Sequence, residues 1–280
     1  MKAPINKIIP FSSVDGPGNR TAVFLQGCNC NCTYCHNPET RKQCINCGQC
    51  VEVCKTGALS IGAENNVRYV ETKCVLCDAC IHICPYDSSP RILWLTPEET
   101  YKRVKKQMPF ISGITVSGGE CMLWPEFIYE LFKLAKQDGL TTLIDSNGTI
   151  SFEKNKRLLE VTDGVMLDMK AFDSREHEKI TGVGNETVLA NAVFLAQNSK
   201  LYEVRAVIVP DLYDTEQSIR QMGEFLAPFL TIHNIRVKII AYRPMGVRKE
   251  YAHYEIPDRS YLEYLAGLLT NQGFLDITII

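Results

Sequence analysis

The chain is organised around one stretch, Gln26-Gly27-Cys28-Asn29-Cys30-Asn31-Cys32-Thr33-Tyr34-Cys35-His36-Asn37-Pro38. Within it Cys28, Cys32 and Cys35 are spaced as C-x3-C-x2-C, with Tyr34 just before the last cysteine. Three thiolates on one short loop can bind three irons of a cubane iron–sulfur cluster. The fourth iron then has no protein ligand from this loop, and an open position on a metal centre is where chemistry takes place. The alternative is a zinc knuckle, but zinc sites usually bring C-x2-C pairs and close all four positions.

The cysteines that follow this loop form an internal repeat. The pattern C-x2-C-x2-C-x3-C occurs twice, and the second copy ends in Pro85. In the bacterial ferredoxin format the fourth cysteine of each run ligates the other cluster. This format assigns the cysteines to two four-iron clusters, one held by Cys44, Cys47, Cys50 and Cys84, the other by Cys74, Cys77, Cys80 and Cys54. Zinc is again the alternative, but two complete copies of this spacing favour iron–sulfur clusters. We therefore predict a ferredoxin-like insert over residues 40–95, within a main domain of residues 1–39 and 96–280.

Composition limits the remaining possibilities. The chain has 280 residues and thirteen cysteines, all but Cys121 lying between Cys28 and Cys84. The odd count argues against a pure disulfide framework, and metal is the better explanation in a cytosolic protein. The formal net charge of −2 gives no electrostatic reason for binding nucleic acid or an anionic membrane. No apolar run approaches the length of a membrane span, so we expect a cytoplasmic protein.

Apolar, β-rich runs alternate with helical patterns along the rest of the chain. The predicted strands cover residues 21–26, 114–117, 142–145, 164–168, 204–209 and 235–241. The predicted helices cover residues 97–108, 126–137, 152–161, 187–197, 216–226 and 261–272, and residues 8–20 are predicted to be a loop. Such βα repetition forms a parallel sheet with right-handed crossovers, either an open doubly wound sheet or a barrel. We favour an α/β fold with an incomplete (β/α)6 barrel.

Polar residues gather at the ends of these predicted strands, where β/α barrels place their active sites. They occur in Ser117-Gly118-Gly119-Glu120, in Asp145-Ser146-Asn147-Gly148, in Met166-Leu167-Asp168-Met169-Lys170, at Arg205, and in Tyr242-Arg243-Pro244. Taken singly, each is as well explained by an ordinary turn or a solvated charge. Together, at successive strand ends facing the cysteine loop, they indicate a cofactor pocket.

A C-x3-C-x2-C loop after a strand is typical of radical S-adenosylmethionine (SAM) enzymes. The chain resembles the glycyl-radical-enzyme activating enzymes, of which pyruvate formate-lyase activase is the best-known type. The strongest stretch runs from Val14-Asp15-Gly16-Pro17-Gly18 through Phe24-Leu25-Gln26-Gly27-Cys28 to Cys35-His36-Asn37-Pro38. The insert places it with the longer members that carry two accessory clusters, and among these it is most similar to the YjjW-type branch.

The resemblance implies a role for each matching residue. Cys28, Cys32 and Cys35 would bind the catalytic four-iron cluster, whose open iron is chelated by SAM. Residues in or beside the SAM pocket would be Tyr34, Ser117, Gly118, Gly119, Glu120, Lys170 and Arg205. Those around a monovalent cation near the SAM carboxylate would be Asp145, Ser146, Met166 and Asp168. Asp15, with Gly16, would engage the glycine loop of the partner enzyme.

The resemblance also implies the reaction. SAM is cleaved reductively to methionine and a 5′-deoxyadenosyl radical, which abstracts a Cα hydrogen from one glycine of a glycyl radical enzyme. The accessory clusters would relay electrons from reduced ferredoxin or flavodoxin. Two alternatives stay open: a radical SAM enzyme acting on a small molecule or another peptide, and a non-enzymatic electron-transfer protein.

Three residues depart from this scheme. Tyr242-Arg243 replaces the Tyr-His of shorter activases, and a guanidinium cannot act as a neutral imidazole does. Cys30 and Cys121 lie outside the three ligand sets, and we expect both to be reduced, unliganded thiols.

Overall fold

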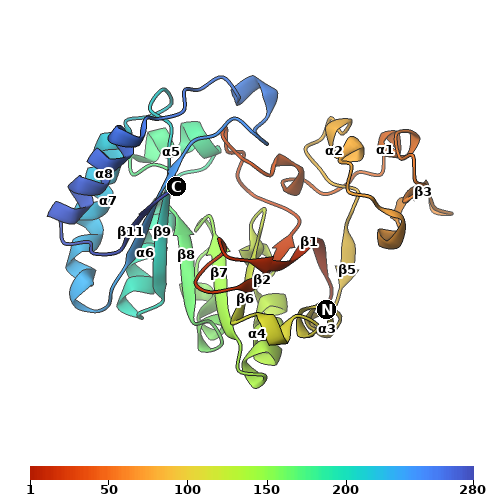
Figure 1. The fold of residues 1–280 in the computed structure, drawn as a ribbon, viewed down its shortest axis with the longest axis horizontal. Coiled ribbons are helices and arrows are strands. Elements are labelled where there is room, and N and C mark those ends of the chain that lie inside the picture. Colours follow the sequence, from red (N-terminus) through yellow and green to blue (C-terminus); the bar gives the residue numbers. More distant parts are fainter.

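The computed structural model describes residues 1–280, and a nine-stranded sheet forms its centre (Figure 1). The strand order is β11-β10-β9-β8-β7-β6-β2-β1-β5. The strands of this sheet are β1 Ala3–Ser12, β2 Arg20–Leu25, β5 Leu93–Leu95, β6 Gly113–Gly118, β7 Thr141–Ser146, β8 Gly164–Asp168, β9 Leu201–Ile208, β10 Arg236–Ala241 and β11 Ile277–Ile279. All neighbouring pairs from β2 to β11 are parallel, whereas β1 pairs antiparallel with β2 and β5. The predicted α/β class and the mostly parallel sheet are confirmed.

The helices bury the apolar face of the sheet. They are α3 Pro97–Lys105, α4 Pro125–Gln137, α5 Ser174–Thr181, α6 Glu186–Gln197, α7 Thr215–Leu226 and α8 Arg259–Asn271. The main core joins helix residues such as Phe127, Phe132 and Leu265 to strand residues such as Ile144 and Val204. A buried aliphatic side chain contributes about 1.5–3 kcal/mol relative to exposure, so this layer supplies most of the driving force for folding. None of the helices is long and apolar enough to span a membrane.

Helix α3 shows how local sequence sets an element's start. Thr96 accepts a hydrogen bond from the Glu99 backbone N–H, and the Glu99 carboxylate accepts one from the Thr96 N–H. This capping box satisfies two backbone donors that the first turn would otherwise leave without partners. Pro97 follows at the first helical position, where a missing N–H costs nothing.

Three predictions of local structure were wrong. Residues 8–12 belong to strand β1, whose two prolines and partly exposed side chains hide its pairing with β2. Residues 152–161 do not form an α-helix: the segment Glu153–Glu160 is a 3-10 helix interrupted by a non-helical Asn155. Helix α5 was missed because it is short and polar, although Asp173 caps its start and Gly182 (φ +80°) ends it.

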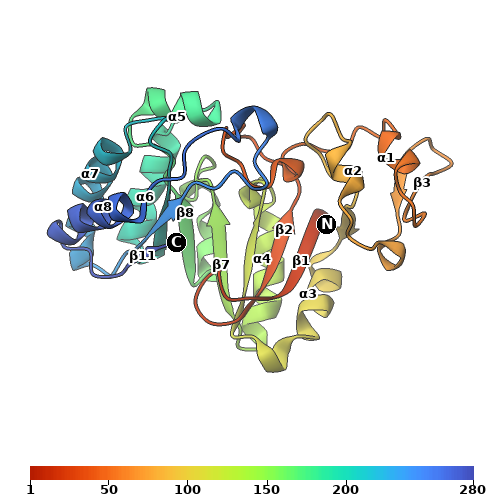
Figure 2. The ribbon, with the colours of Figure 1, turned by 45° about the horizontal axis from the view of Figure 1, so that its top comes forward.

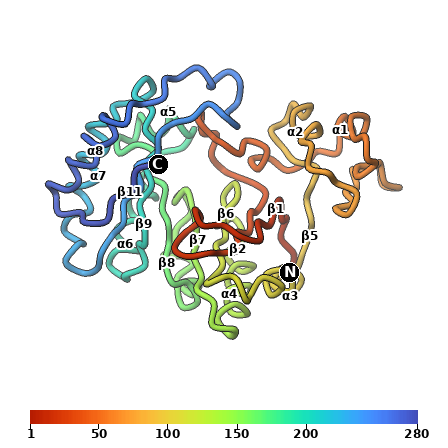
Figure 3. The backbone as a smooth tube through the Cα atoms, in the orientation of Figure 1, coloured from red at the N-terminus to blue at the C-terminus, as the bar shows by residue number.

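The cysteine-rich insert lies beside the β1–β5 edge of the sheet (Figures 1 and 3). It contains two single-turn helices, α1 Gln49–Glu52 and α2 Ala79–His82, and the antiparallel hairpin of β3 Leu59–Ile61 with β4 Val67–Tyr69. Strand β5 returns the chain to the main sheet by pairing with β1. The insert boundaries at residues 40 and 95 stay a prediction, although β5 shows that residues 93–95 join the main sheet.

Candidate active site

The cysteine loop follows β2 at the carboxyl end of the parallel strands, and backbone hydrogen bonds hold it on two sides. Gly27 N donates to Thr40 O and Cys28 N to Arg41 O, both at 2.8 Å. On the other side, Asn31 N donates to Thr181 O at 2.7 Å, at the end of α5. These hydrogen bonds fix the backbone of the loop, and the backbone in turn fixes where the cysteine side chains lie.

The chemistry of the three thiols fits an iron–sulfur cluster. Cys32 is buried, while Cys28 and Cys35 are half-buried. A hydrogen bond from the Cys30 side chain lowers the pKa of Cys32 to about 7 and also lowers the pKa of Cys28, so both favour the thiolate that binds metal. Burial and the nearby Cys32 raise the pKa of Cys35 to about 12, an effect that bound cationic iron would reverse. Nowhere do three or more His, Cys, Asp or Glu side chains converge as ligands of a single ion do.

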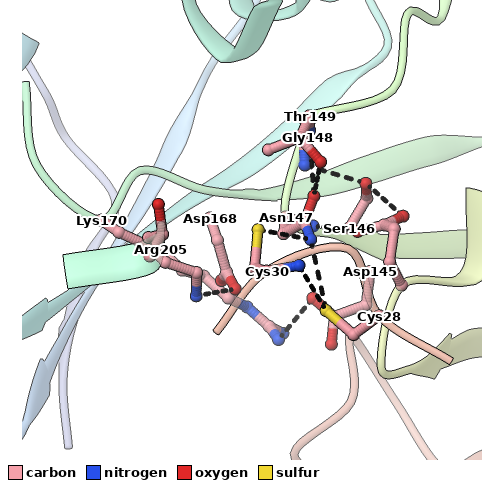
Figure 4. Close-up of polar contacts among 12 residues, drawn as sticks. Cys28, Cys30, Asp145, Ser146, Asn147, Gly148, Thr149, Asp168, Lys170 and Arg205 are labelled. Atoms are coloured by element: carbon pink, nitrogen blue, oxygen red, sulfur yellow. Dashed lines mark hydrogen bonds and ion pairs between the residues drawn. The ribbon is translucent and has the colours of Figure 1, made fainter. Parts of the chain in front are cut away.

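Asn147 connects the cysteine loop to the end of β7 (Figure 4). Its Nδ2 donates to Cys28 Sγ at 3.7 Å, to Cys30 Sγ at 3.3 Å and to Asn29 Oδ1 at 3.2 Å. Its Oδ1 accepts from the N–H and hydroxyl of Thr149, which fixes the amide orientation. Hydrogen bonds to ligand sulfurs are one of the factors that set cluster potential. The sequence placed Asn147 in the pocket segment Asp145–Gly148 but gave it no role of its own.

The Ser117–Glu120 segment contributes to the site through its backbone. A Cβ on Gly119 would lie 2.3 Å from Gly27 O, and one on Gly118 (φ +132°) would lie 2.1 Å from Leu25 O. We predicted that these glycines let a ligand approach, but the atoms nearest to them belong to β2 and the cysteine loop. Their lack of side chains lets β6 and the cysteine loop pack in contact.

Glu120 is fully buried, and its carboxylate is occupied within the chain. It accepts hydrogen bonds from Asn147 N at 2.7 Å, Met122 N at 2.9 Å and the Ser146 hydroxyl at 2.9 Å. Burial raises its pKa to about 7 against these bonds. Glu120 therefore ties the turn after β6 to the turn after β7, and Ser146 faces Glu120 as part of the same network.

Charged side chains line the inner face of the sheet, on strands β7 to β10. Arg205 NH1 lies 3.1 Å from Asp145 Oδ1, its Nε donates to Glu203 Oε1 at 2.6 Å, and its NH2 lies 2.8 Å from Met166 Sδ. Lys238 Nζ contacts Glu203 Oε1 at 3.1 Å. The structure therefore brings together Asp145, Met166 and Arg205, and it adds the pair of Glu203 and Lys238. The sequence held a signal for this pair. Strands of a parallel sheet are usually apolar throughout, whereas Glu203-Val204-Arg205-Ala206 alternates charged and apolar residues.

Lys170 and Asp168 lie beside the cysteine loop. Lys170 Nζ donates to Asp168 Oδ2 at 2.8 Å and lies 5.8 Å from the centre of the Tyr34 ring. Burial lowers the pKa of Lys170, but Asp168, Cys32 and Tyr34 outweigh it and raise the pKa well above its usual value. Lys170 thus stays protonated, and a fixed positive charge faces the cysteine loop. Burial raises the pKa of Asp145, with Asp168 and Asp15 adding to the effect of burial, while Arg205 and the Ser117 hydroxyl oppose it.

The loop with Asp15 and Gly16 lies at the opposite, amino-terminal end of the strands. The fully buried Arg20 holds this loop, since its guanidinium donates to Pro17 O and to both the Oγ1 and the O of Thr141. Thr115 Oγ1 donates to Asp15 O at 2.6 Å, and the Ser12 hydroxyl donates to the Asp15 carboxylate. Asp15 also lies close enough to Asp145 to help raise the pKa of that carboxyl, so this loop faces the same polar surface as Asp145.

The insert brings together cysteines from both copies of its repeat. One cavity is lined by Cys44, Cys47, Cys50, Cys80 and Cys84, together with Tyr86 and other residues. Cys80 and Cys84 of the second run thus lie beside the first three cysteines of the first run. The crossed format expects Cys84 there and assigns Cys80 to the other cluster. Arg91 lies close enough to Cys80 and Cys74 for them, with Asp78, to raise its pKa against the effect of burial.

The three unassigned residues have defined surroundings. Cys30 is buried within the cysteine loop, and its pKa is raised by the side chains of Cys28 and Cys32 and by burial. Cys121 is fully buried and donates from Sγ to Asp145 O at 3.3 Å. The side chain of Arg243 is exposed, and its backbone O lies 3.0 Å from His36 Nε2. The backbone of this position, rather than its side chain, contacts the cysteine loop.

Comparisons with known proteins agree with this geometry. The sequence profile of the Radical SAM superfamily matches residues 22–226. The chain therefore belongs to the radical SAM superfamily, among the activating enzymes of glycyl radical enzymes. It is 31% identical over 267 residues to the choline trimethylamine-lyase activating enzyme of Oleidesulfovibrio alaskensis, covering 89% of this chain and 86% of that protein. It is 32% identical over 252 residues to the pyruvate formate-lyase-activating enzyme of Streptococcus mutans, covering 86% and 78%.

Solved structures share the fold. A domain of pyruvate-formate lyase-activating enzyme from Bacteroides vulgatus superposes with a TM-score of 0.52 at 24% identity, covering 61% of this chain and 99% of that chain. QueE from Escherichia coli superposes with a TM-score of 0.56 at 13% identity, covering 100% of this chain and 94% of that chain. At these identities the likeness concerns the fold alone.

Proposed function

We propose that this activating enzyme abstracts a Cα hydrogen from one glycine of a partner glycyl radical enzyme. The observation that carries the proposal is the arrangement of the sheet's inner face. A cysteine loop closes one end of the parallel strands, a polar face lined by Asp145, Asp168 and Arg205 follows, and the Asp15 loop lies at the other end. A peptide loop that enters past Asp15 would meet this polar face before it reaches the cysteine loop. We interpret the six strands β2 and β6 to β10 as an incomplete (β/α)6 barrel.

The residues of the chain would bind and orient the reactants. Cys28, Cys32 and Cys35 would hold a four-iron cluster, and the Ser117–Glu120 turn and Lys170 would position SAM beside it. Bound there, the cluster and SAM supply the one-electron cleavage that yields methionine and a 5′-deoxyadenosyl radical. Asp145, Ser146, Met166 and Asp168 surround the place proposed for a monovalent cation, although in this structure Arg205 pairs with Asp145. Because these charged groups are held on rigid strands before the substrate binds, little free energy is needed to orient them during the reaction.

The insert would carry two accessory four-iron clusters and relay electrons from reduced ferredoxin or flavodoxin in the cytoplasm. The cavity where Cys84 meets Cys44, Cys47 and Cys50 supports the crossed ligand set for one cluster. For the other, Cys74, Cys77 and Cys80 lie on the second run, and Cys54 completes the set in the ferredoxin format. We therefore describe the insert as a ferredoxin-like module.

The test is anaerobic incubation of the reconstituted enzyme with SAM, reductant and the cognate glycyl radical enzyme. We expect electron paramagnetic resonance (EPR) to show a stable radical on the partner, with a doublet that collapses when its glycine is deuterated at Cα. Reactions without SAM are the control. If every glycyl radical enzyme of the source organism stays silent while a small metabolite drives rapid release of 5′-deoxyadenosine, the enzyme acts on that metabolite instead.

A further inference from the structure

The segment between β10 and α8 covers the cysteine loop from outside (Figures 1 and 2). We name residues 242–254 the C-terminal strap. Tyr242 and Val247 of the strap pack with Tyr34 of the cysteine loop in a small apolar cluster, separate from the main core. Gly246 (φ +85°) lies against His36, because a Cβ there would be 2.8 Å from His36 O. The strap is therefore seated on the loop that carries the catalytic cysteines.

Arg248 of the strap joins the cysteine loop to the insert. Its NH2 donates to Cys32 O at 3.0 Å and to Asn31 O at 3.5 Å. Its NH1 lies 3.7 Å from Asp87 Oδ2, and its guanidinium lies over the Tyr251 ring at 4.8 Å. A planar guanidinium can make such contacts on two sides at once, whereas an ammonium group cannot.

Asp87 stands at the base of the insert. It follows Cys84 by three residues, and its partner Arg41 precedes Cys44 by three. Arg41 NH2 lies 2.6 Å from the same Asp87 Oδ2, and Lys42 N donates to Asp87 O at 3.1 Å. The carboxylate thus ties together the two chain segments that enter and leave the proposed first accessory cluster.

The charges at this junction pair two against two. Two guanidiniums, Arg41 and Arg248, share the Asp87 carboxylate, and each arginine side chain is only 12% exposed. Arg248 Nε also lies 4.0 Å from Glu250 Oε1, although it makes no hydrogen bond. Because both guanidiniums are largely buried, removing one partner would leave a buried charge uncompensated, which is strongly destabilising. The junction between the cysteine loop and the insert therefore depends on each of these charged groups.

We propose that Arg248 is a positioning residue that holds the catalytic cysteine loop against the insert, so that electrons delivered to the insert reach the catalytic cluster. The inference rests on the accessory clusters of the proposed function. Shorter activases have a histidine where this chain has Arg243. The role proposed for the strap does not depend on that histidine. Asp87 and Arg41 complete the bridge from the side of the insert.

The test compares two electron sources in reconstituted enzyme: reduced flavodoxin, which is expected to enter through the insert, and dithionite, which can reach the catalytic cluster directly. For Arg248→Gln we expect flavodoxin-driven SAM cleavage to fall about 10- to 100-fold, with much smaller loss under dithionite, because displacement of a positioned group has costs of this order. Asp87→Asn breaks the bridge from the other side and should show the same split. Arg248→Lys should rescue little, and Lys249→Gln, on an exposed side chain of the same strap, should match wild type.

EPR provides a readout independent of turnover. In fully reduced wild type the catalytic and accessory clusters should broaden each other's signals, and this broadening should weaken in Arg248→Gln and Asp87→Asn. Equal loss under both electron sources, or unchanged broadening with unchanged flavodoxin-driven rates, overturns the inference. If iron analysis finds only one cluster in the wild-type enzyme, the proposed accessory clusters are wrong. If it finds three clusters but the variants behave like wild type, only the role of Arg248 is wrong.

Discussion

At the scale of single residues, the site depends on atoms that sequence patterns do not reveal. The spacing of Cys28, Cys32 and Cys35 identified the metal-binding loop, because three ligands on one short loop leave a local signature. Asn147 received no role of its own because its contacts exist only once β7 and the cysteine loop meet. Glu120 was expected beside SAM, whereas in the structure its carboxylate accepts hydrogen bonds from Asn147 and Ser146. Motif spacing predicts contacts between residues that are close in sequence. The hydrogen bonds of Asn147 and Glu120 join segments that are far apart in sequence.

Gly119 provides the sharpest prediction at this scale. In Gly119→Ala the new Cβ would lie 2.3 Å from Gly27 O and 2.8 Å from Thr40 O, both backbone atoms that cannot rotate away. We expect a loss of about 1–3 kcal/mol of stability, typical of overpacking, together with displacement of the cysteine loop. The measurement is iron content and thermal unfolding of the reconstituted protein. Gly267→Ala on α8 is the control, since it needs no positive φ and has no atom near its Cβ position. Full iron loading of Gly119→Ala with wild-type stability would contradict this account.

At the scale of elements, the strongly patterned segments were predicted well. The six predicted strands and five of the six predicted helices exist, because buried runs and amphipathic faces are encoded locally. Strand β1 was missed because it contains two prolines and is partly exposed, and helix α5 was missed because it is short and polar. Strands β5 and β11 are short edge strands of three residues each, too short to give a periodic signal.

The cysteine-rich insert yields a prediction that separates its role from that of the catalytic loop. With dithionite as reductant, Cys32→Ala should abolish SAM cleavage, because it removes a ligand of the cluster that holds SAM. Cys47→Ala and Cys77→Ala should leave measurable cleavage, because each damages only the relay. Iron and sulfide analysis should give about twelve irons per wild-type chain, as three four-iron clusters require. Stoichiometric zinc, or one cluster only, would rule out the relay. Equal loss in all three folded variants would mean that the accessory clusters serve the chemistry itself.

At the scale of the whole molecule, the two ends of the parallel strands carry different functions. The cysteine loop, the C-terminal strap and the insert meet at the carboxyl end, where electrons and SAM are expected (Figure 2). The Asp15 loop lies at the amino-terminal end, fixed by Arg20 and Thr115. Sequence similarity identified both segments, but only the fold shows that Asp15 and Asp145 face the same polar surface of the sheet.

This position of the Asp15 loop predicts that Asp15 affects the partner more than it affects SAM. If the Asp15 carboxylate accepts backbone N–H bonds from an incoming glycine loop, its loss removes charge-assisted hydrogen bonds worth about 1.5–3 kcal/mol each. Asp15→Ala should therefore reduce glycyl radical formation on the partner by about 10- to 100-fold. Slow, uncoupled SAM cleavage should change little, because the hydrogen bonds of Asp15 go to Ser12 and Thr115 and not to the cysteine loop.

The measurement pairs EPR quantification of the partner radical with chromatography of 5′-deoxyadenosine released without a partner. Glu224→Ala, which removes an exposed acid on α7, controls for the change in net charge. Asp15→Asn keeps one acceptor oxygen and should fall between wild type and Asp15→Ala. Because the Ser12 hydroxyl also donates to the Asp15 carboxylate, Ser12→Ala should loosen the loop and give a milder loss of the same kind. If Asp15→Ala lowers both readings equally, Asp15 supports the fold of the site and does not receive the glycine loop.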